Sequence, residues 1–281
     1  MSLLDAIAGL AKSLLTEDLR RRLRGKHNSV RKRFVDDPLE RLNLAIATLC
    51  GENYQSWYAR RMDSFISQRS GEDIAKLSQF SGGIEDLDVL KDLGLKPTHR
   101  FYEFGHGQGR TAQHVISYLD EGRYFGNDAS PGRVSEFLSL MEYRGLRGKN
   151  PTVWVTRTND FSWVPEGWTF DYLWEKSVLN HMPDTDVRVW LRSIPRILHR
   201  NSIVLLTDGH LDGTEKCLRY TVKDWFRPAS WYCREAEACG FKAEDVSHLL
   251  RYGIGGHAKN VSQAGDETFT YSSHLVKLTL R

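Results

Sequence analysis

The chain contains 281 residues with a mass of 32.3 kDa, the size of one α/β domain with a helical extension or of two smaller domains. A hydrophobic content of 40% and a charged content of 27% exclude intrinsic disorder, collagen and coiled-coil rods. The net charge of +3 does not indicate a nucleic-acid-binding protein, and no apolar run approaches the roughly 18–20 residues of a membrane span. The four cysteines form no Cys-x-x-Cys pair and the N-terminus lacks export-signal features, so we expect a cytoplasmic protein.

The first 33 residues combine an amphipathic helical pattern with a basic cluster. Apolar residues recur from Leu3 to Leu15 at the spacing of one helix face, and Lys and Arg are concentrated between Arg20 and Arg33. Such a segment can contact an anionic membrane surface as a peripheral protein does, or bind nucleic-acid phosphates. It can also pack on the domain or on a partner chain, as in a homo-oligomer. We favour packing, with membrane contact as the main alternative.

The helical pattern continues over residues 36–93 and includes the aromatic residues Tyr54, Trp57 and Tyr58. These side chains can belong to a helical lid over a ligand or to ordinary core packing, and we favour packing. The Ser81-Gly82-Gly83 sequence is expected to break the chain before a last short helix.

After Pro97 the pattern changes to short apolar segments that alternate with helical ones. Strands are expected at residues 100–104, 124–127, 151–156, 170–174, 202–206, 242–250 and 273–280, and helices at 111–119, 132–144, 187–198 and before Gly240. Strands separated by helices form a mostly parallel sheet covered on both faces. We therefore expect an α/β domain over residues 94–281, preceded by an N-terminal helical extension or lid over residues 1–93.

The most informative sequence is a glycine turn between a predicted strand and a predicted helix. Gly105, Gly107 and Gly109 alternate along it, and Glu103 precedes them by two residues. Glycine allows the backbone to turn sharply and a ligand to approach it closely. The turn does not match the dinucleotide fingerprint because Arg110 stands at the third glycine position, and no Gly-Lys-Ser/Thr of a P-loop follows. The Glu103 carboxylate would repel a pyrophosphate and attract a cationic ligand.

These features resemble the class I S-adenosylmethionine-dependent methyltransferases over roughly residues 94–281. The resemblance implies a Rossmann-like fold: a mostly parallel seven-stranded sheet with helices on both faces and an antiparallel C-terminal strand. It implies S-adenosyl-L-methionine as the cofactor, with these binding residues: Glu103, Gly105, Gly107 and Gly109 at the methionine part, Asp128 at the ribose, and Asn159, Asp160 and Phe161 at the adenine. Asp128 lies about 20 residues beyond the glycines, as a β-α-β unit requires of a ribose acid. The chain departs from the family at His106, where a small residue or Cys is more common, and at His199-Arg200-Asn201-Ser202, which replaces a Lys-Pro-Gly-Gly turn.

The leading candidate for a general base is His181, just beyond the fourth predicted strand. An imidazole titrates near neutral pH and can accept a hydroxyl proton. His181 can instead cap the turn or pack beneath the cofactor, and His210, after the fifth strand, is the second candidate base. Glu175 either contacts an acceptor or anchors the loop, and we favour the loop. No Cys, His, Asp and Glu cluster has metal-ligand spacing, so no metal is expected.

The turn after the fourth strand also bears on the methyl acceptor. Its sequence, Glu175-Lys176-Ser177, lacks the Pro-Pro pair of nucleic-acid amino methyltransferases, and no Pro precedes a Cys as in cytosine-C5 enzymes, so DNA is not an expected substrate. We expect methyl transfer to a small molecule or saccharide, with oxygen accepting if His181 is the base. Aromatic residues near Trp225 and Trp231 can stack on a ring or pack on the sheet. The alternatives are a lipid-linked glycan at a membrane surface, a protein that binds S-adenosylmethionine without catalysis, and a nicotinamide enzyme.

Overall fold

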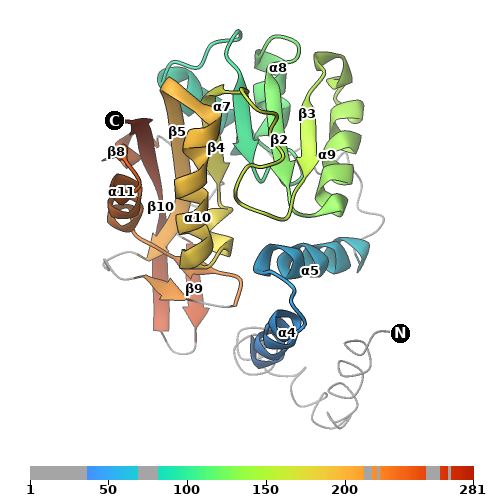
Figure 1. Ribbon diagram of the computed structural model, residues 1–281, viewed down its shortest axis with the longest axis vertical. Coiled ribbons are helices and arrows are strands. Elements are labelled where there is room, and N and C mark those ends of the chain that lie inside the picture. Colours follow the sequence, from blue (N-terminus) through green and yellow to red (C-terminus); the bar gives the residue numbers. More distant parts are fainter. Residues whose placement is uncertain (1–36, 69–81, 212–216, 220–221, 251–259, 265–266) are drawn as a thin grey trace.

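The computed structural model describes residues 37–68, 82–211, 217–219, 222–250, 260–264 and 267–281 (Figure 1). The predicted helix from Leu3 to Leu15 and the basic cluster that follows it lie outside the described residues, and so does the expectation of membrane contact through residues 1–33. Among the helices that the structure describes, none is long and apolar enough to cross a membrane.

The core of the protein is a twisted, mostly parallel sheet with helices on both faces (Figure 1). Its strands, in spatial order, are β3 (Thr152–Val155), β2 (Tyr124–Asp128), β1 (Phe101–Phe104), β4 (Phe170–Lys176), β5 (Leu198–Leu211), β10 (Glu267–Leu280) and β8 (Phe241–Asp245). The first five strands are parallel, and β10 runs antiparallel to both β5 and β8. The predicted Rossmann-like fold, with its seven strands and antiparallel C-terminal strand, is confirmed.

The strand order reverses at β1, which lies between β2 and β4. Chain connections leave β1 and β4 in opposite directions there, so a crevice opens beyond their carboxyl ends. Two short pairings were not predicted: β9 (Asn260–Ala264) extends the sheet beside β10, and β6 (Leu218–Arg219) pairs with β7 (Trp225–Phe226). The crevice beside β1 is the place where this fold can position a ligand.

Alternate side chains of each strand enter two separate cores. One core contains Tyr102 and Leu173 and is covered by α10 (Asp184–Ser193) and α11 (Ala229–Ala238). The other contains Phe101 and Trp174. It is covered by α7 (Gly82–Asp92), α8 (Ala112–Tyr118) and α9 (Pro131–Tyr143). Burial on both faces explains why the strands are apolar throughout. Helix α7 contributes Leu87, Val89 and Leu90 to the second core and so packs directly on the sheet.

Two N-terminal helices, α4 (Asp37–Leu49) and α5 (Tyr54–Gln68), lie beyond the carboxyl ends of the strands (Figure 1). Trp57 is fully buried with Ala47 and Val222 in a small third core. Asp63 fixes α5 to the start of α9, because its carboxylate accepts hydrogen bonds from the Ser130 hydroxyl and the Gly132 amide. These contacts place α5 across the crevice.

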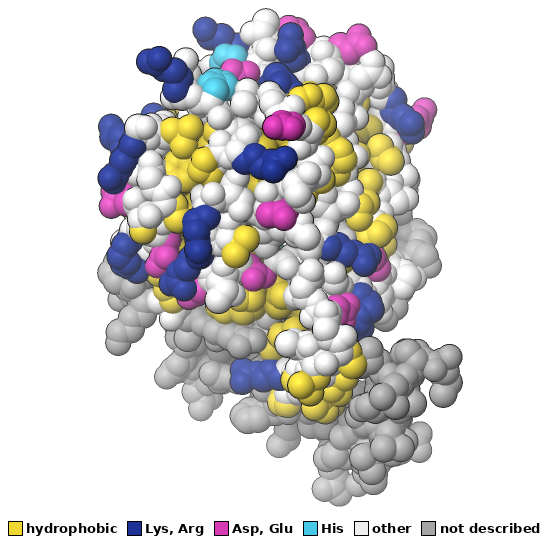
Figure 2. All heavy atoms as spheres, in the orientation of Figure 1, with side chains coloured by type: hydrophobic (Ala, Val, Ile, Leu, Met, Phe, Trp, Pro, Cys, Tyr) yellow, Lys and Arg dark blue, Asp and Glu magenta, His cyan; other side chains and the backbone are white. Residues whose placement is uncertain are grey.

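Figure 2 shows acidic and basic side chains interspersed over one face, with hydrophobic side chains gathered over α4. Leu42 and Leu49 of this helix are 50% and 88% exposed. Over this face, the described residues form no continuous basic surface of the kind that binds a polyanion.

At three places the difference between the predicted and the observed elements has an identifiable physical cause. Gly82 and Gly83 lie in the first turn of α7, and a Cβ on Gly83 would lie 2.1 Å from the Arg110 carbonyl oxygen. Glycine therefore permits a close approach of two backbones there. The strand expected at 242–250 ends at Asp245, whose carboxylate accepts a hydrogen bond from the Ser247 amide and starts a 3₁₀ turn, η5 (Ser247–Leu249). The strand expected at 202–206 is longer at both ends, because β10 pairs with it as far as Leu211 and β4 pairs with it from Leu198.

Candidate active site

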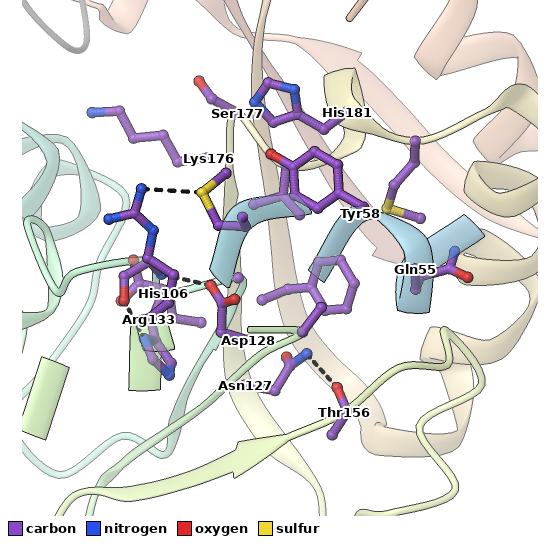
Figure 3. Close-up of a pocket in the computed structure, with 18 of the residues that line it drawn as sticks. Gln55, Tyr58, His106, Asn127, Asp128, Arg133, Thr156, Lys176, Ser177 and His181 are labelled. Carbon is purple, nitrogen blue, oxygen red and sulfur yellow. Dashed lines mark hydrogen bonds between the residues drawn. The ribbon is translucent and has the colours of Figure 1, made fainter. Parts of the chain in front are cut away.

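A cavity of about 480 Å³ lies beyond the carboxyl ends of β1, β2 and β4 and is covered by α5 (Figure 3). Besides α5, the cavity is lined mainly by the glycine turn after β1, the end of β2, the segment after β3 and the turn after β4. Figure 3 shows Asp128 and His181 on different sides of the space, with Tyr58 of α5 between them. Residues predicted from separate motifs therefore meet in one cavity.

The three glycines of the turn have different physical roles. All three have positive φ angles: 72° at Gly105, 55° at Gly107 and 89° at Gly109, a region that other residues occupy only at a cost. A Cβ on Gly105 would lie 2.4 Å from Cγ2 of Val178, and one on Gly109 would lie 3.0 Å from the Phe137 ring. A Cβ on Gly107 would meet no atom within 4 Å, although Gly107 lines the cavity. Gly105 and Gly109 therefore permit packing, whereas Gly107 leaves room for a ligand.

Glu103, the acid ahead of the glycines, lines the cavity but is only 4% exposed. Its Oε2 accepts a hydrogen bond of 2.6 Å from the Tyr124 hydroxyl. Burial raises the pKa of Glu103 to about 8, although the Tyr124 hydrogen bond and the positive charges of Lys176 and Arg110 favour ionisation. In the free protein at pH 7 this carboxyl group is therefore mostly protonated, and a cation bound beside it would ionise it.

His106, a departure from the family pattern, is buried within the glycine turn. Its Nδ1 lies 2.9 Å from the carbonyl oxygen of Gly107, and the centroid of its ring lies 4.4 Å from the centroid of the Phe137 ring. Burial lowers the pKa of His106, which keeps the ring neutral. The imidazole thus supports the turn and does not place a positive charge beside a cationic ligand.

Asp128, the last residue of β2, connects that strand to the glycine turn. Its Oδ2 accepts a hydrogen bond of 3.1 Å from the Gly107 amide, and its Oδ1 accepts one of 2.9 Å from the Ser130 amide. A carboxylate offers about four acceptor sites, so both oxygens can also accept from ligand hydroxyls. The side chain is partly exposed and lines the cavity, as a residue that binds a ribose requires.

The segment predicted to hold an adenine is only partly on the cavity. Asn159 lines it, together with Thr156 and Thr158. Asp160 and Phe161 are not among the lining residues. The exposed Asp160 carboxylate accepts hydrogen bonds from Thr158 and Ser162. Phe161 adopts a φ of 56° and buries its ring completely in the core beneath the sheet. The chain thus turns away from the cavity directly after Asn159.

The turn after β4 is held from below by Glu175, which is fully buried. Its Oε1 accepts hydrogen bonds from the amides of Val178 at 2.6 Å and Leu179 at 2.9 Å, so Glu175 anchors the loop. Ser177 has a φ of 55° and faces the cavity. The following 3₁₀ turn, η3 (Leu179–His181), brings His181 to the cavity wall.

A buried ion pair at the same turn was not recognised from the sequence. Lys176 Nζ lies 2.5 Å and 2.6 Å from the two carboxylate oxygens of Asp86, and Oδ2 of Asp86 also accepts from Thr111 at 2.5 Å. The two charged side chains are 6% and 0% exposed. Burial lowers the pKa of Lys176 to about 8, against the opposing effect of Asp86. The partners are 90 residues apart in sequence, so no local pattern reveals them.

His181 has a defined orientation. Its Nδ1 lies 2.9 Å from the carbonyl oxygen of Lys223 and 3.1 Å from Oδ1 of Asp224. Both partners are acceptors, so Nδ1 carries a proton and the lone pair of the neutral ring is on Nε2. Burial lowers the pKa of His181, but the Asp224 hydrogen bond and charge, with smaller contributions from the Lys223 carbonyl and Asp208, raise it above its usual value. For His210, the second candidate base, only the backbone in β5 lies within the described residues.

Helix α5, which covers the cavity, contributes two kinds of aromatic residue. Tyr54 and Tyr58 line the cavity, and Tyr58 stacks on the His181 ring with centroids 5.5 Å apart. Burial raises the pKa of Tyr58, as do the nearby charges of Asp128 and Asp224. Trp57 instead packs in the third core. Tyr54 and Tyr58 thus lie on the cavity, whereas Trp57 belongs to core packing, because successive helix positions face different directions.

Comparison with solved structures identifies the fold. The YcgJ protein from Bacillus subtilis aligns with a TM-score of 0.52 and 16% identity over 70% of this chain and 97% of that chain. The glycopeptide N-methyltransferase MtfA complexed with S-adenosyl-L-methionine aligns with a TM-score of 0.53 and 12% identity over 73% and 96% of the two chains. The Haemonchus contortus phosphoethanolamine N-methyltransferase 2, complexed with phosphomonomethylethanolamine and S-adenosylhomocysteine, aligns with a TM-score of 0.52 and 16% identity. The alignment covers 70% of this chain and 52% of that chain.

No protein-family model matches the chain, and a search of curated protein sequences finds no match. The structural similarity, together with the strand order and the glycine turn, shows that this chain has the class I S-adenosylmethionine-dependent methyltransferase fold.

Proposed function

We propose that this protein is an S-adenosylmethionine-dependent methyltransferase that transfers the methyl group to a hydroxyl of a small molecule or saccharide, with His181 as the general base. The observation that carries this proposal is the single cavity in which the glycine turn, Asp128 and His181 meet. Three motifs that are separated in sequence supply, respectively, a close backbone approach, a ribose acceptor and a proton acceptor.

The residues present fit the cofactor. Glu103 offers a carboxyl group to an ammonium or sulfonium, Gly107 leaves open space above the turn, and Asp128 retains acceptor capacity for ribose hydroxyls. Asn159, which lines the cavity, would contact the adenine. When bound, S-adenosylmethionine supplies an electrophilic methyl group on a positively charged sulfur. The protein then has to orient an acceptor and exclude water, an effect that accounts for about 7–11 kcal/mol in well-oriented reactions.

The acceptor side of the cavity favours a hydroxyl. The Nε2 lone pair of neutral His181 is available to remove a hydroxyl proton, and a positioned base of this kind contributes about 10²–10⁴-fold to the rate. Because the pKa of His181 is raised, the neutral form and therefore the activity increase as the pH rises through that pKa. Tyr54 and Tyr58 supply aromatic faces on which a sugar or another ring can stack.

The proposal is tested first by cofactor binding. Isothermal titration of the full chain with S-adenosylmethionine and S-adenosylhomocysteine is expected to give measurable affinity for both, since their binding groups are the same. Asp128→Ala is expected to weaken binding at least about tenfold, because a charge-assisted hydrogen bond contributes about 1.5–3 kcal/mol. Asp120→Ala, which changes an exposed aspartate outside the cavity, is the matched control. Absence of heat with both ligands, or NAD binding in their place, contradicts the proposal.

Methyl transfer is tested with fractions of a cell metabolite extract and radiolabelled S-adenosylmethionine. Labelled product is expected, with the methyl group on oxygen by NMR, and His181→Gln is expected to reduce its formation by about 10²–10⁴-fold while cofactor affinity is retained. A methyl group on nitrogen would overturn the assignment of a hydroxyl acceptor. Binding without any labelled product would instead identify a non-catalytic cofactor-binding protein.

Binding of the cofactor is also expected to release a proton through Glu103. Its carboxyl group has a pKa of about 8 in the free protein, and a neighbouring ammonium lowers that pKa, so about one proton leaves at pH 7. The affinity therefore rises as the pH increases towards 8. Titrations of S-adenosylhomocysteine at pH 7 in two buffers with different ionisation heats measure the proton count. Glu103→Gln should abolish the release, and equal heats for the unsubstituted protein in both buffers would refute the coupling.

A further inference from the structure

The segment of residues 222–227 contacts the His181 side chain. It lies between β5 and α11, and it supplies both partners of the His181 Nδ1: the Lys223 carbonyl at 2.9 Å and the Asp224 carboxylate at 3.1 Å. The Tyr58 ring stacks on the imidazole, with an interplanar angle of 27°. The two acceptors at Nδ1 therefore fix the tautomer and the direction of the His181 ring, and the stacking of Tyr58 fixes the plane of the ring.

We propose that Asp224 is a positioning residue for methyl transfer: its carboxylate holds the proton on Nδ1 of His181 and directs Nε2 to the acceptor, and the lid helices α4 and α5 hold Asp224 in place. This inference rests on the proposed function for its catalytic consequence. The orientation of His181 itself can be measured without an acceptor. Asp224 is 43 residues from His181 in sequence, and no motif joins them.

The lid side of the segment is held by packing and by two polar contacts. Val222 is fully buried between Ala47 of α4 and Trp57 of α5. The Tyr54 hydroxyl donates a hydrogen bond of 3.2 Å to the Val222 carbonyl oxygen. Lys223 Nζ lies 3.0 Å from Oε1 of Glu40 in α4, which also accepts from Arg61 at 3.0 Å. The position of Asp224 therefore depends on the lid helices.

The other side of the segment is held by Arg227, whose side chain is fully buried. Its guanidinium donates to the carbonyl oxygens of Leu179 at 2.9 Å and Met182 at 2.6 Å, on either side of His181, and forms an ion pair of 2.7 Å with Asp184. The segment is thus fixed to the lid at one end and to the His181 turn at the other. A carboxylate held in this way restricts the imidazole more strongly than a mobile surface residue does.

Charged groups face His181 from several elements. Asp224, Lys223 and Arg227 belong to the segment, Asp208 belongs to the buried end of β5, and Tyr58 belongs to α5. Asp208 is buried and accepts a hydrogen bond from Tyr232, whereas Asp224 contacts the ring directly. Removal of the Asp224 charge should therefore have the largest single effect on the protonation of His181.

The experiment is an NMR titration of the imidazole signals in the full chain labelled at histidine, with His181→Gln to assign the His181 signal. Asp224→Asn is expected to lower the pKa of His181 by about one unit or more and to reduce the fraction of rings protonated on Nδ1, while Asp224→Glu retains both properties. The matched control is Asp171→Asn: Asp171 lies 3.1 Å from Nε2 of His199, with similar exposure, outside the cavity. It should leave His181 unchanged.

A double variant tests the part played by the lid. Tyr54→Phe with Glu40→Ala removes both polar contacts to the segment, and the His181 pKa should fall in the same direction as in Asp224→Asn but by less. An unchanged titration in the double variant would overturn the role of the lid. An unchanged titration and tautomer in Asp224→Asn, or an equal effect of Asp171→Asn, would overturn the positioning role of Asp224.

The catalytic consequence is measured separately. With an acceptor in hand, Asp224→Asn is expected to lower kcat at least about tenfold, without changing the affinity for S-adenosylhomocysteine, because the cofactor residues are untouched. A kcat equal to that of the unsubstituted protein overturns the catalytic part of the inference. Failure to find any methyl transfer would count against the proposed function, while the NMR result would still decide the orientation of His181.

Discussion

Replacement of Lys176 by Met is expected to lower the free energy of unfolding by about 3–5 kcal/mol. Lys176 and Asp86 are almost completely buried and contact each other through both carboxylate oxygens. Loss of the ammonium leaves Asp86 as a charge without its ionic partner, and the Thr111 hydroxyl alone cannot compensate for it. The measurement is equilibrium unfolding in urea, followed by tryptophan fluorescence.

Two further variants make this prediction specific. The double variant Lys176→Met with Asp86→Asn removes both charges and should recover a large part of the lost stability, because replacement of both partners of a buried pair is far less costly than removal of one. Arg60→Met breaks a surface pair with Glu52 whose side chains are 45% and 22% exposed. It should cost less than about 1 kcal/mol. Equal losses of stability in Lys176→Met and Arg60→Met would show that the buried pair of Lys176 and Asp86 does not stabilise the protein as we infer.

The second large effect is expected from the glycine turn, where Gly105→Ala and Gly107→Ala should differ in kind. A Cβ on Gly105 would lie 2.4 Å from Val178. Gly105→Ala should therefore lower the free energy of unfolding for two reasons. A positive φ costs about 1–2 kcal/mol in a residue other than glycine, and the overpacking against Val178 costs about 1–3 kcal/mol. Gly107→Ala carries the backbone cost alone, because no atom lies within 4 Å of its Cβ position. That Cβ would occupy the cavity, so it should weaken cofactor binding at least about tenfold while the protein stays folded.

The two effects are separated by thermal unfolding and calorimetry on the same samples. Gly105→Ala should lower the Tm much more than Gly107→Ala, and Val178→Ala in the Gly105→Ala background should restore part of the loss by removing the methyl groups that clash. Gly122→Ala is the control, because Gly122 has a φ of 70°, meets no atom within 4 Å and lies outside the cavity. If Gly107→Ala binds the cofactor as well as Gly122→Ala does, the glycine turn does not hold the cofactor.

Much of the fold follows from local pattern. The glycine turn, the apolar strands around it and the helices after them were predicted within a few residues, because backbone conformation there depends on adjacent residues. Gly83 has a tertiary role that the sequence pattern did not indicate, because it permits the close approach of the Arg110 backbone. The length of β5 likewise depends on pairing with β10, which is distant in sequence.

The candidate site divides in the same way. Glu103, Gly105, Gly107, Asp128, Asn159 and His181 all lie on the cavity. Each lies at or shortly after the end of a strand that the sequence pattern located. Asp160 and Phe161 belong to the same predicted motif, but they do not line the cavity. Phe161 itself has a left-handed backbone conformation, which directs its ring into the core. Such a turn depends on where a buried ring can be accommodated, which the motif does not specify.

The sequence by itself determined the class of fold, the glycine turn and the acid at the end of the second strand, because strand ends and glycine turns depend on residues close together in the chain. Only the tertiary structure decided the environment of each charge. It paired Lys176 with Asp86, raised the pKa of Glu103 to about 8, and brought Asp224 to His181. These properties depend on burial and on contacts between distant segments, and a carboxylate in a sequence has neither until the chain has folded around it.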